Sequence, residues 1–411
     1  MSTPRHLVIL GGGLTSHSAA LAARHNGYDG SIVIATDESH PPYDRTPLSK
    51  AVLQGTRDTA DLGFQPDVDY ETDGIQLLTG TTASAVDTTS RRVRLSDGET
   101  LQYDDLLFAT GASPVHLNGP GFELDGVHYL RTIPDAERLK DSLTGARRVL
   151  VIGAGFIGSE VAASARSLGA EVILADLAPV PLSAALHPDL SSIVAAIHQD
   201  HGVELRLRTS VQELRGTQRV EEGVFDDGSP VECDLVVVGV GVQPNVTLAE
   251  DAGIRVENGI VTDEYCRTSA PDVYAAGDVA NWWHPGLERR IRIEHFDNAG
   301  AQGTHAGKVI AGGDVEPFAP VPYFWSDQFD TNIQYAGYPK ADCDVIIRGD
   351  PESRSVTGFY LRNGEMQAAV TINRAREFRA VRRLVAARAM IDPRTLQDPE
   401  TDIRKLSREY R

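Results

Sequence analysis

The sequence contains one arrangement twice: an apolar strand, a glycine-rich turn, a helix, and a second apolar strand that ends in a carboxylate. The first copy is "HLVILGGGLTSHSAALAARHNGYDGSIVIATDE" and the second is "RRVLVIGAGFIGSEVAASARSLGAEVILADLAP". Such a turn lets the backbone approach a pyrophosphate, whose negative charge then rests on the helix N-terminus. Two copies in the correct context predict two bound dinucleotides, and a protein that binds two usually moves electrons between them.

The two turns differ at one glycine. The second copy has all three expected glycines, Gly153, Gly155 and Gly158. The first copy has Gly11 and Gly13, but Ser16 stands where the third glycine is expected. Because the third glycine allows close helix–strand packing, the serine predicts a slightly wider crossing and not the loss of the site. Taken alone, the first copy is also compatible with an ordinary strand–helix turn without a ligand.

The carboxylates at the strand ends indicate which dinucleotide each copy binds. Asp176 can accept hydrogen bonds from the 2′-hydroxyl of NAD and would repel the 2′-phosphate of NADP. The following residues, "LAPVPL", include no Arg or Lys that could neutralise that phosphate. The second turn is therefore predicted to bind NADH. Asp37 and Glu38 end the corresponding strand of the first copy, which is assigned to FAD.

Three further stretches support the FAD assignment. In "DVYAAGDVA" a buried strand is followed by Gly277 and Asp278, whose carboxylate can accept hydrogen bonds from ribityl hydroxyls. "LQYDDLLFATGASP" gives another buried strand and a glycine turn that suits a crossover between domains. "PPYDRTPLSK" carries Arg45 and Lys50 in a proline-stiffened loop. Each stretch alone could be a core strand with a tight turn.

Composition excludes several classes of protein. The chain has 411 residues, enough for two or three domains, and 41% hydrophobic and 24% charged residues, as in soluble globular proteins. The first strand begins at His6 and no apolar run could span a membrane, which predicts a cytoplasmic protein. The cysteines are isolated at Cys233, Cys266 and Cys343, so neither a metal site nor a redox pair is expected. A net charge of −19 argues against nucleic acid and anionic membranes as partners.

The C-terminal residues are basic in an otherwise acidic chain. Residues 374–411 contain eleven Lys or Arg and six Asp or Glu. "RAREFRAVRRLVAARAM" has helical spacing, with one apolar face formed by Phe378, Val381, Leu384 and Val385. It predicts either a solvated amphipathic helix or a docking surface for an acidic partner. "LERRIRIEHF" is a second basic candidate for docking.

Over nearly its full length the sequence resembles the NADH-dependent ferredoxin reductases of oxygenase systems. The motifs that carry the resemblance are "PPYDRTPLSK", "ATGA", "YLRTIPDAERL", "VIGAGFIGSEVA", "VVVGVGVQPN", "YAAGDVA", "HFDNAGAQG" and "PYFWSDQFDTNIQYAG". The last is the most discriminating, because other two-dinucleotide flavoproteins build their C-terminal domain differently.

The resemblance implies an α/β fold of two Rossmann-like dinucleotide-binding domains plus a C-terminal α+β domain. An FAD-binding domain is expected over residues 1–112 and 245–319. An NAD-binding domain is expected over residues 113–244, inserted between the two parts. A C-terminal reductase domain is expected over residues 320–411.

The resemblance also implies site residues. Lys50 would lie close to the isoalloxazine ring, Glu160 would approach the nicotinamide, and Trp325 would lie beside the flavin. A helix-face carboxylate paired to Lys50 is the alternative for Glu160, and a buried core aromatic is the alternative for Trp325. The full set of expected cofactor-binding residues is Gly11, Gly13, Leu14, Thr15, Asp37, Glu38, Arg45, Lys50, Ala83, Thr110, Gly111, Arg131, Gly153, Gly155, Phe156, Ile157, Gly158, Glu160, Asp176, Gly241, Gly277, Asp278, Glu294, His295, Phe296 and Trp325.

Four positions depart from the family pattern, and all of them bear on the flavin's environment. Ser16 replaces a glycine, and Thr15 stands at a position that is commonly alanine. Phe296 stands where many relatives have tryptophan, and Ser113 where arginine is common.

The function implied is hydride transfer from NADH to FAD, followed by single-electron transfer to an acidic iron–sulfur ferredoxin. That ferredoxin would serve a Rieske or haem oxygenase, and the reductase would be a monomer or homodimer. Rubredoxin reductase and monodehydroascorbate reductase are alternatives of the same family, and an NADH-sensing flavoprotein resembling apoptosis-inducing factor is another. Disulfide reductases are excluded because the chain has no redox pair of cysteines, and NADH peroxidases, NADH oxidases and coenzyme A disulfide reductases because the first cysteine is Cys233.

Overall fold

The computed structural model describes residues 5–64 and 70–410. The chain forms two compact units. Unit 1 comprises residues 1–44, 60–113 and 242–320, and unit 2 comprises residues 45–59, 114–241 and 321–411. Two of the passages between units lie next to the short strands β8 (Ala112–Pro114) and β17 (Val242–Pro244). Among the described helices, none combines the length and the apolar character needed to cross a membrane.

Unit 1 is built on a five-stranded parallel sheet. Its order is β19 (Val273–Ala275), β7 (Asp105–Phe108), β1 (His6–Leu10), β2 (Ser31–Ala35) and β3 (Ile75–Leu78). Leu10 pairs with Ala35 on one side and with Phe108 on the other, so the central strand is hydrogen-bonded along both edges. The inner strands β7, β1 and β2 are mostly buried apolar runs, because both faces of a parallel sheet are covered.

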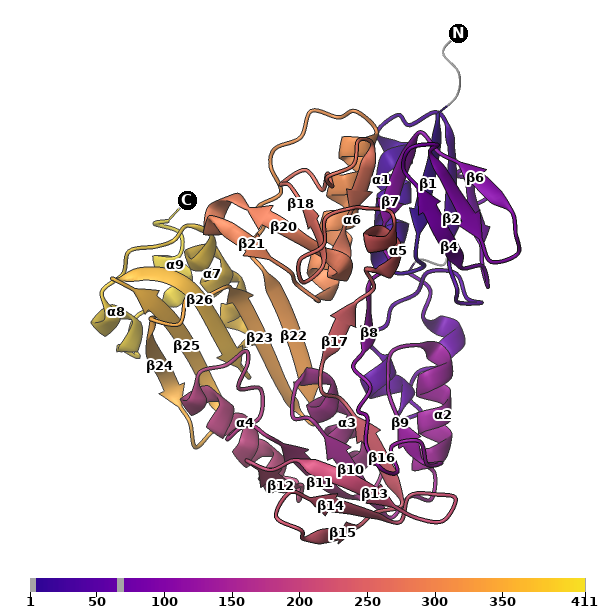
Figure 1. The fold of residues 1–411 in the computed structure, drawn as a ribbon. Helices are drawn as coiled ribbons and strands as arrows, with labels where there is room; N and C mark the ends of the chain where they lie inside the picture. The colour runs from indigo at the N-terminus through magenta and orange to yellow at the C-terminus, as the bar shows by residue number, and fades with distance from the viewer. Residues whose placement is uncertain (1–4, 65–69, 411) are drawn as a thin grey trace. The chain divides into compact units, whose positions relative to one another are not determined.

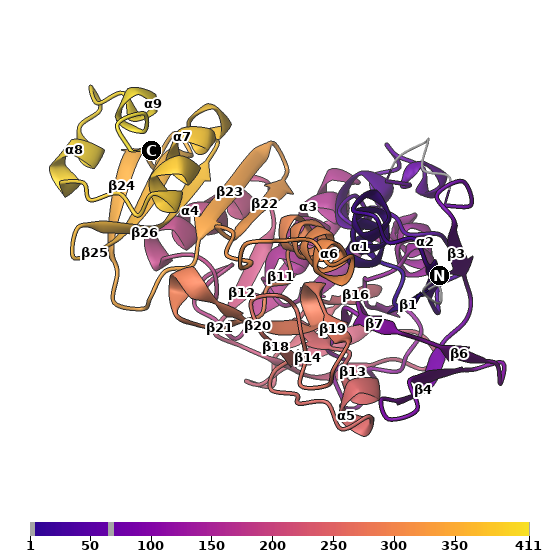
Figure 2. The ribbon, with the colours of Figure 1, turned by 90° about the horizontal axis from the view of Figure 1, so that it is seen from above.

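Two helices of unit 1 pack closely against each other. Helix α6 (Phe296–Ile310) lies beside α1 (Leu14–His25), as Figures 1 and 2 show. A Cβ atom added at Gly303 would lie 2.4 Å from the carbonyl oxygen of Thr15, and one added at Gly307 would lie 2.2 Å from that of Ala19. The glycines of α6 therefore let the two backbones approach each other.

The rest of unit 1 consists of short antiparallel and mixed sheets. One sheet contains β4 (Ala83–Asp87), β5 (Arg92–Leu95) and β6 (Thr100–Gln102). Another contains β18 (Ile260–Thr262), β20 (Ala280–His284) and β21 (Arg289–Ile291). Helix α5 spans Thr247–Asp251.

Unit 2 contains a second five-stranded parallel sheet. Its order is β12 (Glu204–Leu207), β11 (Glu171–Asp176), β10 (Arg148–Ile152), β16 (Leu235–Val238) and β9 (Val127–His128). The helices of this part are α2 (Ile133–Leu143), α3 (Phe156–Ser167) and α4 (Pro188–Asp200). A three-stranded antiparallel sheet contains β13 (Val211–Arg215), β14 (Glu222–Phe225) and β15 (Pro230–Glu232). Thr132 and Asp135 form a capping box that starts α2.

The C-terminal part of unit 2 is an antiparallel sheet with helices. The strand order is β22 (Tyr323–Gln328), β23 (Thr331–Gly337), β26 (Glu365–Ile372), β25 (Ser355–Arg362) and β24 (Asp344–Asp350). Helix α7 (Ala375–Ala386) covers one face of the sheet, and α8 (Pro393–Gln397) and α9 (Ile403–Leu406) follow it (Figure 1). The predicted apolar face of α7 is confirmed: Phe378, Val381, Leu384 and Val385 are all buried there.

Helix α4 packs against the opposite face of the same sheet. Leu190 and Ile193 of α4 share a core with Tyr335 and Tyr360 of the sheet. A Cβ atom at Gly358 would lie 2.6 Å from a methyl group of Leu190. This shared core explains why residues 114–241 and 321–411 form a single compact unit.

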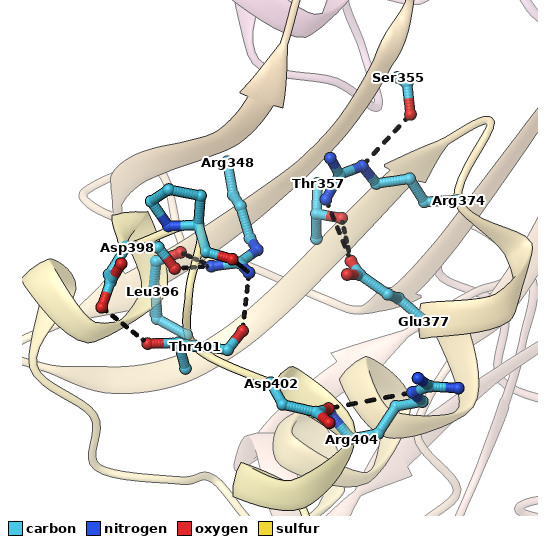
Figure 3. Close-up of polar contacts among 11 residues, drawn as sticks. Arg348, Ser355, Thr357, Arg374, Glu377, Leu396, Asp398, Thr401, Asp402 and Arg404 are labelled. Carbon is cyan, nitrogen blue, oxygen red and sulfur yellow. Dashed lines mark hydrogen bonds and ion pairs between the residues drawn. The ribbon is translucent and has the colours of Figure 1, made fainter.

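A buried arginine fixes the last segment of the chain. Arg348 of β24 is 6% exposed, and its guanidinium group donates to four backbone carbonyls (Figure 3). The acceptors are Leu396 at 3.1 Å, Pro399 at 3.0 Å, Thr401 at 2.7 Å, and also Asp398. The segment that carries α8 and α9 is thereby tied to the sheet.

The predicted fold class is confirmed: two five-stranded parallel sheets, each with helices, and a C-terminal α+β part are present. The division into three domains stays a prediction. Residues 45–59, which the sequence analysis assigns to the FAD-binding domain, belong to unit 2 in the structure.

Candidate functional site

The first glycine turn offers an open helix N-terminus. Gly13 is the N-cap of α1 and has extended backbone geometry, and Leu14 is the first helical residue. A Cβ atom added at Gly13 would meet no described atom within 4 Å, whereas one at Gly11 would lie 2.2 Å from the carbonyl oxygen of Ala109. The turn is therefore tight against the sheet and open on its outer side. The backbone N–H groups at this helix start are suited to a pyrophosphate.

Ser16 closes the first turn by a hydrogen bond. The side chain is fully buried, and its Oγ donates to the carbonyl oxygen of Gly11 over 2.6 Å. In the second turn, a Cβ atom at Gly158 would lie only 1.9 Å from the carbonyl oxygen of Gly153. The first turn has room for a side chain that the second excludes, and the wider crossing stays a prediction.

A cavity of about 340 Å³ in unit 1 lies at the ends of the parallel strands. It contains four of the predicted FAD-site residues: Gly11, Asp37, Ala83 and Thr110. The complete lining is Leu10, Gly11, Ala35, Thr36, Asp37, Thr81, Thr82, Ala83, Thr110, Ser113, Asn245, Thr247 and Leu248. Its size and its mixture of apolar and hydroxyl side chains fit part of a dinucleotide.

The glycine–aspartate pair predicted to hold the ribityl chain lies at the start of α1. Gly277 has φ +78°, and a Cβ atom there would lie 2.2 Å from Oγ1 of Thr15. Its N–H donates to Oε1 of the buried Gln302 over 2.8 Å. Asp278 follows in the same 3₁₀ turn, Gly277–Val279. The sequence analysis missed Gln302, although an amide between the small residues Ala301 and Gly303 of α6 could have indicated it.

Three predicted residues lie at the N-terminus of α6. His295 is the N-cap, Phe296 is the first helical residue, and Glu294 accepts from Arg292. Burial lowers the pKa of His295 to about 4, and the nearby carboxylate of Asp278 only partly opposes this effect. The imidazole is therefore neutral at pH 7.

Other predicted residues form hydrogen bonds within loops or lie in tight turns. Glu38 accepts a hydrogen bond from the hydroxyl of Tyr43 at 2.6 Å. Nη1 of Arg45 donates to the carbonyl oxygen of Arg131 over 2.9 Å. Gly111 and Gly241 have φ of +66° and +109°, as glycine turns require.

The second turn repeats the open geometry. Gly155 is the N-cap of α3, and a Cβ atom there would meet no described atom within 4 Å. Phe156 packs on Phe324 with ring centroids 4.5 Å apart, and Ile157 is 45% exposed. This turn also fits a pyrophosphate.

Asp176 is held at the end of β11 by two backbone donors. Its Oδ2 accepts from the N–H of Ala154 over 2.6 Å, and its Oδ1 accepts from that of Ala178 over 2.7 Å. Each carboxylate oxygen has a second lone pair, so the group can still accept from a ribose. The carboxylate is thus fixed beside the second turn.

Glu160 receives three hydrogen bonds within unit 2. Its Oε2 accepts from Oγ of Ser49 at 2.5 Å and from Nζ of Lys50 at 3.1 Å. Its Oε1 accepts from Oγ of Ser326 at 2.7 Å. The Glu160 side chain is 5% exposed and that of Lys50 20%. The pairing with Lys50 that was the alternative interpretation is present, and the predicted approach to nicotinamide stays a prediction. The sequence analysis missed both serines.

Trp325 lies on the opposite face of β22 from Ser326. Side chains alternate along this strand, with Phe324, Ser326 and Gln328 buried and Trp325 half-buried. The Trp325 and Tyr323 rings stack with centroids 5.9 Å apart. Trp325 is therefore not part of the fully buried core.

Comparison with known proteins identifies the class. The pyridine nucleotide-disulphide oxidoreductase model matches residues 5–303, and the reductase C-terminal model matches residues 323–407. The chain therefore belongs to the pyridine nucleotide-disulphide oxidoreductases that carry the reductase C-terminal domain.

Individual relatives narrow the comparison. The ferredoxin–NAD(+) reductase component of the anthranilate 1,2-dioxygenase system of Burkholderia cepacia is 39% identical over 399 residues, 97% of this chain and 98% of the relative. Rhodocoxin reductase of Rhodococcus erythropolis is 35% identical over 399 residues, 97% of this chain and 93% of the relative. The crystal structure of the covalent putidaredoxin reductase–putidaredoxin complex matches with a TM-score of 0.96 at 32% identity, covering 100% of this chain and 99% of that chain.

These findings confirm the predicted family resemblance, the class of enzyme as an oxidoreductase, and FAD and NADH as its cofactors. The roles of the individual site residues stay predictions.

Proposed function

We propose that the chain is an NADH:ferredoxin reductase that delivers electrons to an iron–sulfur ferredoxin of an oxygenase system. One observation carries the proposal: two open glycine turns and a reductase C-terminal domain occur in one chain, and ferredoxin–NAD(+) reductases match it over nearly their whole length. FAD supplies the conversion of a hydride from NADH into single electrons, which no side chain could perform.

The residues of unit 1 hold FAD. The N–H groups at the start of α1 bind the pyrophosphate, and Asp37 in the 340 Å³ cavity accepts from the adenosine ribose. Asp278, which follows Gly277 in the turn Gly277–Val279 beside the start of α1, accepts from the ribityl hydroxyls.

The residues of unit 2 bind and orient NADH. The start of α3 binds the second pyrophosphate, and Asp176 selects the 2′-hydroxyl. The three hydrogen bonds to Glu160 do not use all the lone pairs of its carboxylate. With the remaining lone pair, Glu160 accepts a hydrogen bond that orients the nicotinamide. The Lys50 ammonium group would stabilise the negative charge that FAD gains with a hydride.

Helix α7 supplies the docking surface for an acidic ferredoxin. Arg376, Arg379 and Arg383 are exposed on the side away from its apolar face. The other basic candidate, "LERRIRIEHF", is turned inward at Arg290, which donates to the carbonyls of Thr262 and Asn281. A positive patch on an acidic protein steers a negatively charged partner to one side.

A steady-state assay tests the proposal. The flavin-loaded protein should reduce at least one of the [2Fe–2S] ferredoxins encoded near its gene with NADH. Failure with every such ferredoxin, together with slow reoxidation and a long-lived charge-transfer band, would favour the NADH-sensing alternative. Faster turnover with rubredoxin or monodehydroascorbate would favour the corresponding reductase.

A further inference from the structure

A chain of buried polar side chains leads from helix α4 to Glu160 along one face of the C-terminal sheet. Nε2 of His198 in α4 lies 2.8 Å from Oε1 of Gln328. Nε2 of Gln328 donates to Oγ of Ser326 over 3.1 Å, and Ser326 donates to Glu160. His198, Gln328 and Ser326 are each at most 1% exposed.

The hydrogen bonds of this chain all run in one direction. Because the amide oxygen of Gln328 only accepts, Nε2 of His198 carries the hydrogen. The amide NH₂ then donates to the serine hydroxyl, which donates to the carboxylate. Aligned donors polarise one another and strengthen the last bond, which Ser326 donates to the Glu160 carboxylate.

The two sets of bonds fix both oxygens of the carboxylate. Ser49 and Lys50 come from the loop 45–59 and hold Oε2, whereas Ser326 comes from β22 and holds Oε1. Without the serine, the carboxylate would keep only the partners of Oε2, and no described side chain would hold Oε1. Its orientation therefore depends on the C-terminal sheet.

Packing alone does not account for these residues. On the buried face of β22, the apolar Phe324 is followed by the polar residues Ser326 and Gln328. Burying a polar group at such a position costs free energy of folding unless the group is hydrogen-bonded. His198 bears the same cost, since its Nδ1 has no hydrogen-bond partner among the described residues. The unpartnered Nδ1 of His198 therefore costs stability that an apolar side chain at this position would not.

We propose that Ser326, Gln328 and His198 are positioning residues that orient the Glu160 carboxylate for nicotinamide, which makes the C-terminal sheet part of the NADH site. This inference rests on the proposed function. The three residues act through Glu160 and touch neither cofactor in the proposal.

Anaerobic stopped-flow reduction of the flavin-loaded protein by NADH tests the inference. Ser326→Ala should lower the reduction rate at saturating NADH roughly tenfold, because misoriented reactants lose rate more than affinity. The dissociation constant for NADH should change less than about threefold, since Glu160 is only one of the groups that bind NADH. Gln328→Leu should lower the rate less, because it leaves the last bond to Glu160 intact.

The double variant tests whether the residues act in series. Gln328→Leu should have no further effect in the Ser326→Ala background, whereas two independent structural defects would add. Ser191→Ala is the matched control. It removes another fully buried serine hydroxyl of unit 2, one with no partner among the described residues, and should leave the rate unchanged.

The outcomes separate the inference from the proposed function. If NADH does not reduce the wild-type flavin, the proposed function fails. If it does, and both Ser326→Ala and Gln328→Leu match Ser191→Ala, the inference is overturned and the function stands. Should Ser326→Ala lose FAD on purification, Gln328→Leu alone decides: a lowered rate at saturating NADH supports the inference, and an unchanged rate overturns it.

Discussion

Ser16 and Gly158 occupy equivalent places in the two glycine turns, yet their surroundings differ. The Ser16 hydroxyl has a backbone acceptor at 2.6 Å, whereas a Cβ atom at Gly158 would overlap the carbonyl oxygen of Gly153. The same motif thus tolerates a side chain in one copy and excludes it in the other.

This difference predicts opposite sensitivities. Gly158→Ser should destabilise unit 2 by about 3 kcal/mol or more and abolish NADH binding, because α3 must move away from the backbone. Ser16→Ala loses one neutral hydrogen bond and should cost about 1 kcal/mol with FAD retained. Urea denaturation and cofactor titration of both variants check this. A stable Gly158→Ser protein that binds NADH normally would contradict it.

Asp176 gives a second prediction at this scale. Asp176→Asn turns an amide donor toward one of two backbone N–H donors, so it disturbs both the turn and the ribose contact. The value of kcat/KM for NADH should fall roughly 30-fold. The ratio of kcat/KM for NADH to kcat/KM for NADPH should fall by about tenfold.

Glu171→Gln is the control for Asp176. Glu171 lies on the same strand, where its ion pair with Arg148 is solvent-exposed, and kinetics with both nucleotides should be unchanged. An unaltered NADH preference in Asp176→Asn would remove this residue from cofactor selection.

Sequence alone predicted the residues that belong to local patterns. Gly155 and Asp176 are read from a strand–turn–helix pattern within about thirty residues. Ser49 and Ser326 could not be predicted in this way, because they meet Glu160 only through tertiary packing over 111 and 166 residues. The alternation of β22 did contain a signal, since two polar residues share a face with Phe324.

At the scale of elements, the C-terminal segment depends on one buried cation. Arg348 donates hydrogen bonds to the backbone carbonyls of four residues between 396 and 401. These carbonyls lie close to the ends of α8 and α9, and without Arg348 they would lose these hydrogen bonds. The planar guanidinium group can span these acceptors, whereas an ammonium group is a compact point charge with three donors.

Arg348→Lys should therefore destabilise the protein by about 3 kcal/mol. Hydrogen exchange of residues 393–406 should become faster, while exchange in α7 should stay slow. Arg374→Lys is the control, because Arg374 makes longer bonds to Ser355 and Glu377 at 3.3 and 3.4 Å (Figure 3). Equal exchange in the two variants would contradict the role of Arg348.

For the whole molecule, the distribution of charge determines which side of the protein attracts an acidic partner. The chain carries a net charge of −19, yet eleven of its basic residues lie in the last 38 positions. The exposed arginines of α7 are therefore a positive patch on a protein that otherwise repels acidic partners.

Ferredoxin reduction should accordingly slow as salt is added. Between about 50 and 500 mM NaCl, kcat/KM for an acidic ferredoxin should fall roughly tenfold, because salt screens the electrostatic attraction that brings the two proteins together. Replacing Arg379 and Arg383 by Gln should reduce this dependence without changing flavin reduction by NADH. A flat salt dependence would indicate an apolar docking surface.

The central claim is that one chain accepts a hydride from NADH and releases single electrons to a ferredoxin. Anaerobic single-turnover spectroscopy of the purified flavoprotein tests it most directly. One equivalent of NADH should bleach the flavin, and two equivalents of a [2Fe–2S] ferredoxin should then restore its colour while becoming reduced. A flavin that NADH does not bleach, or that stays bleached with every ferredoxin, would contradict the account.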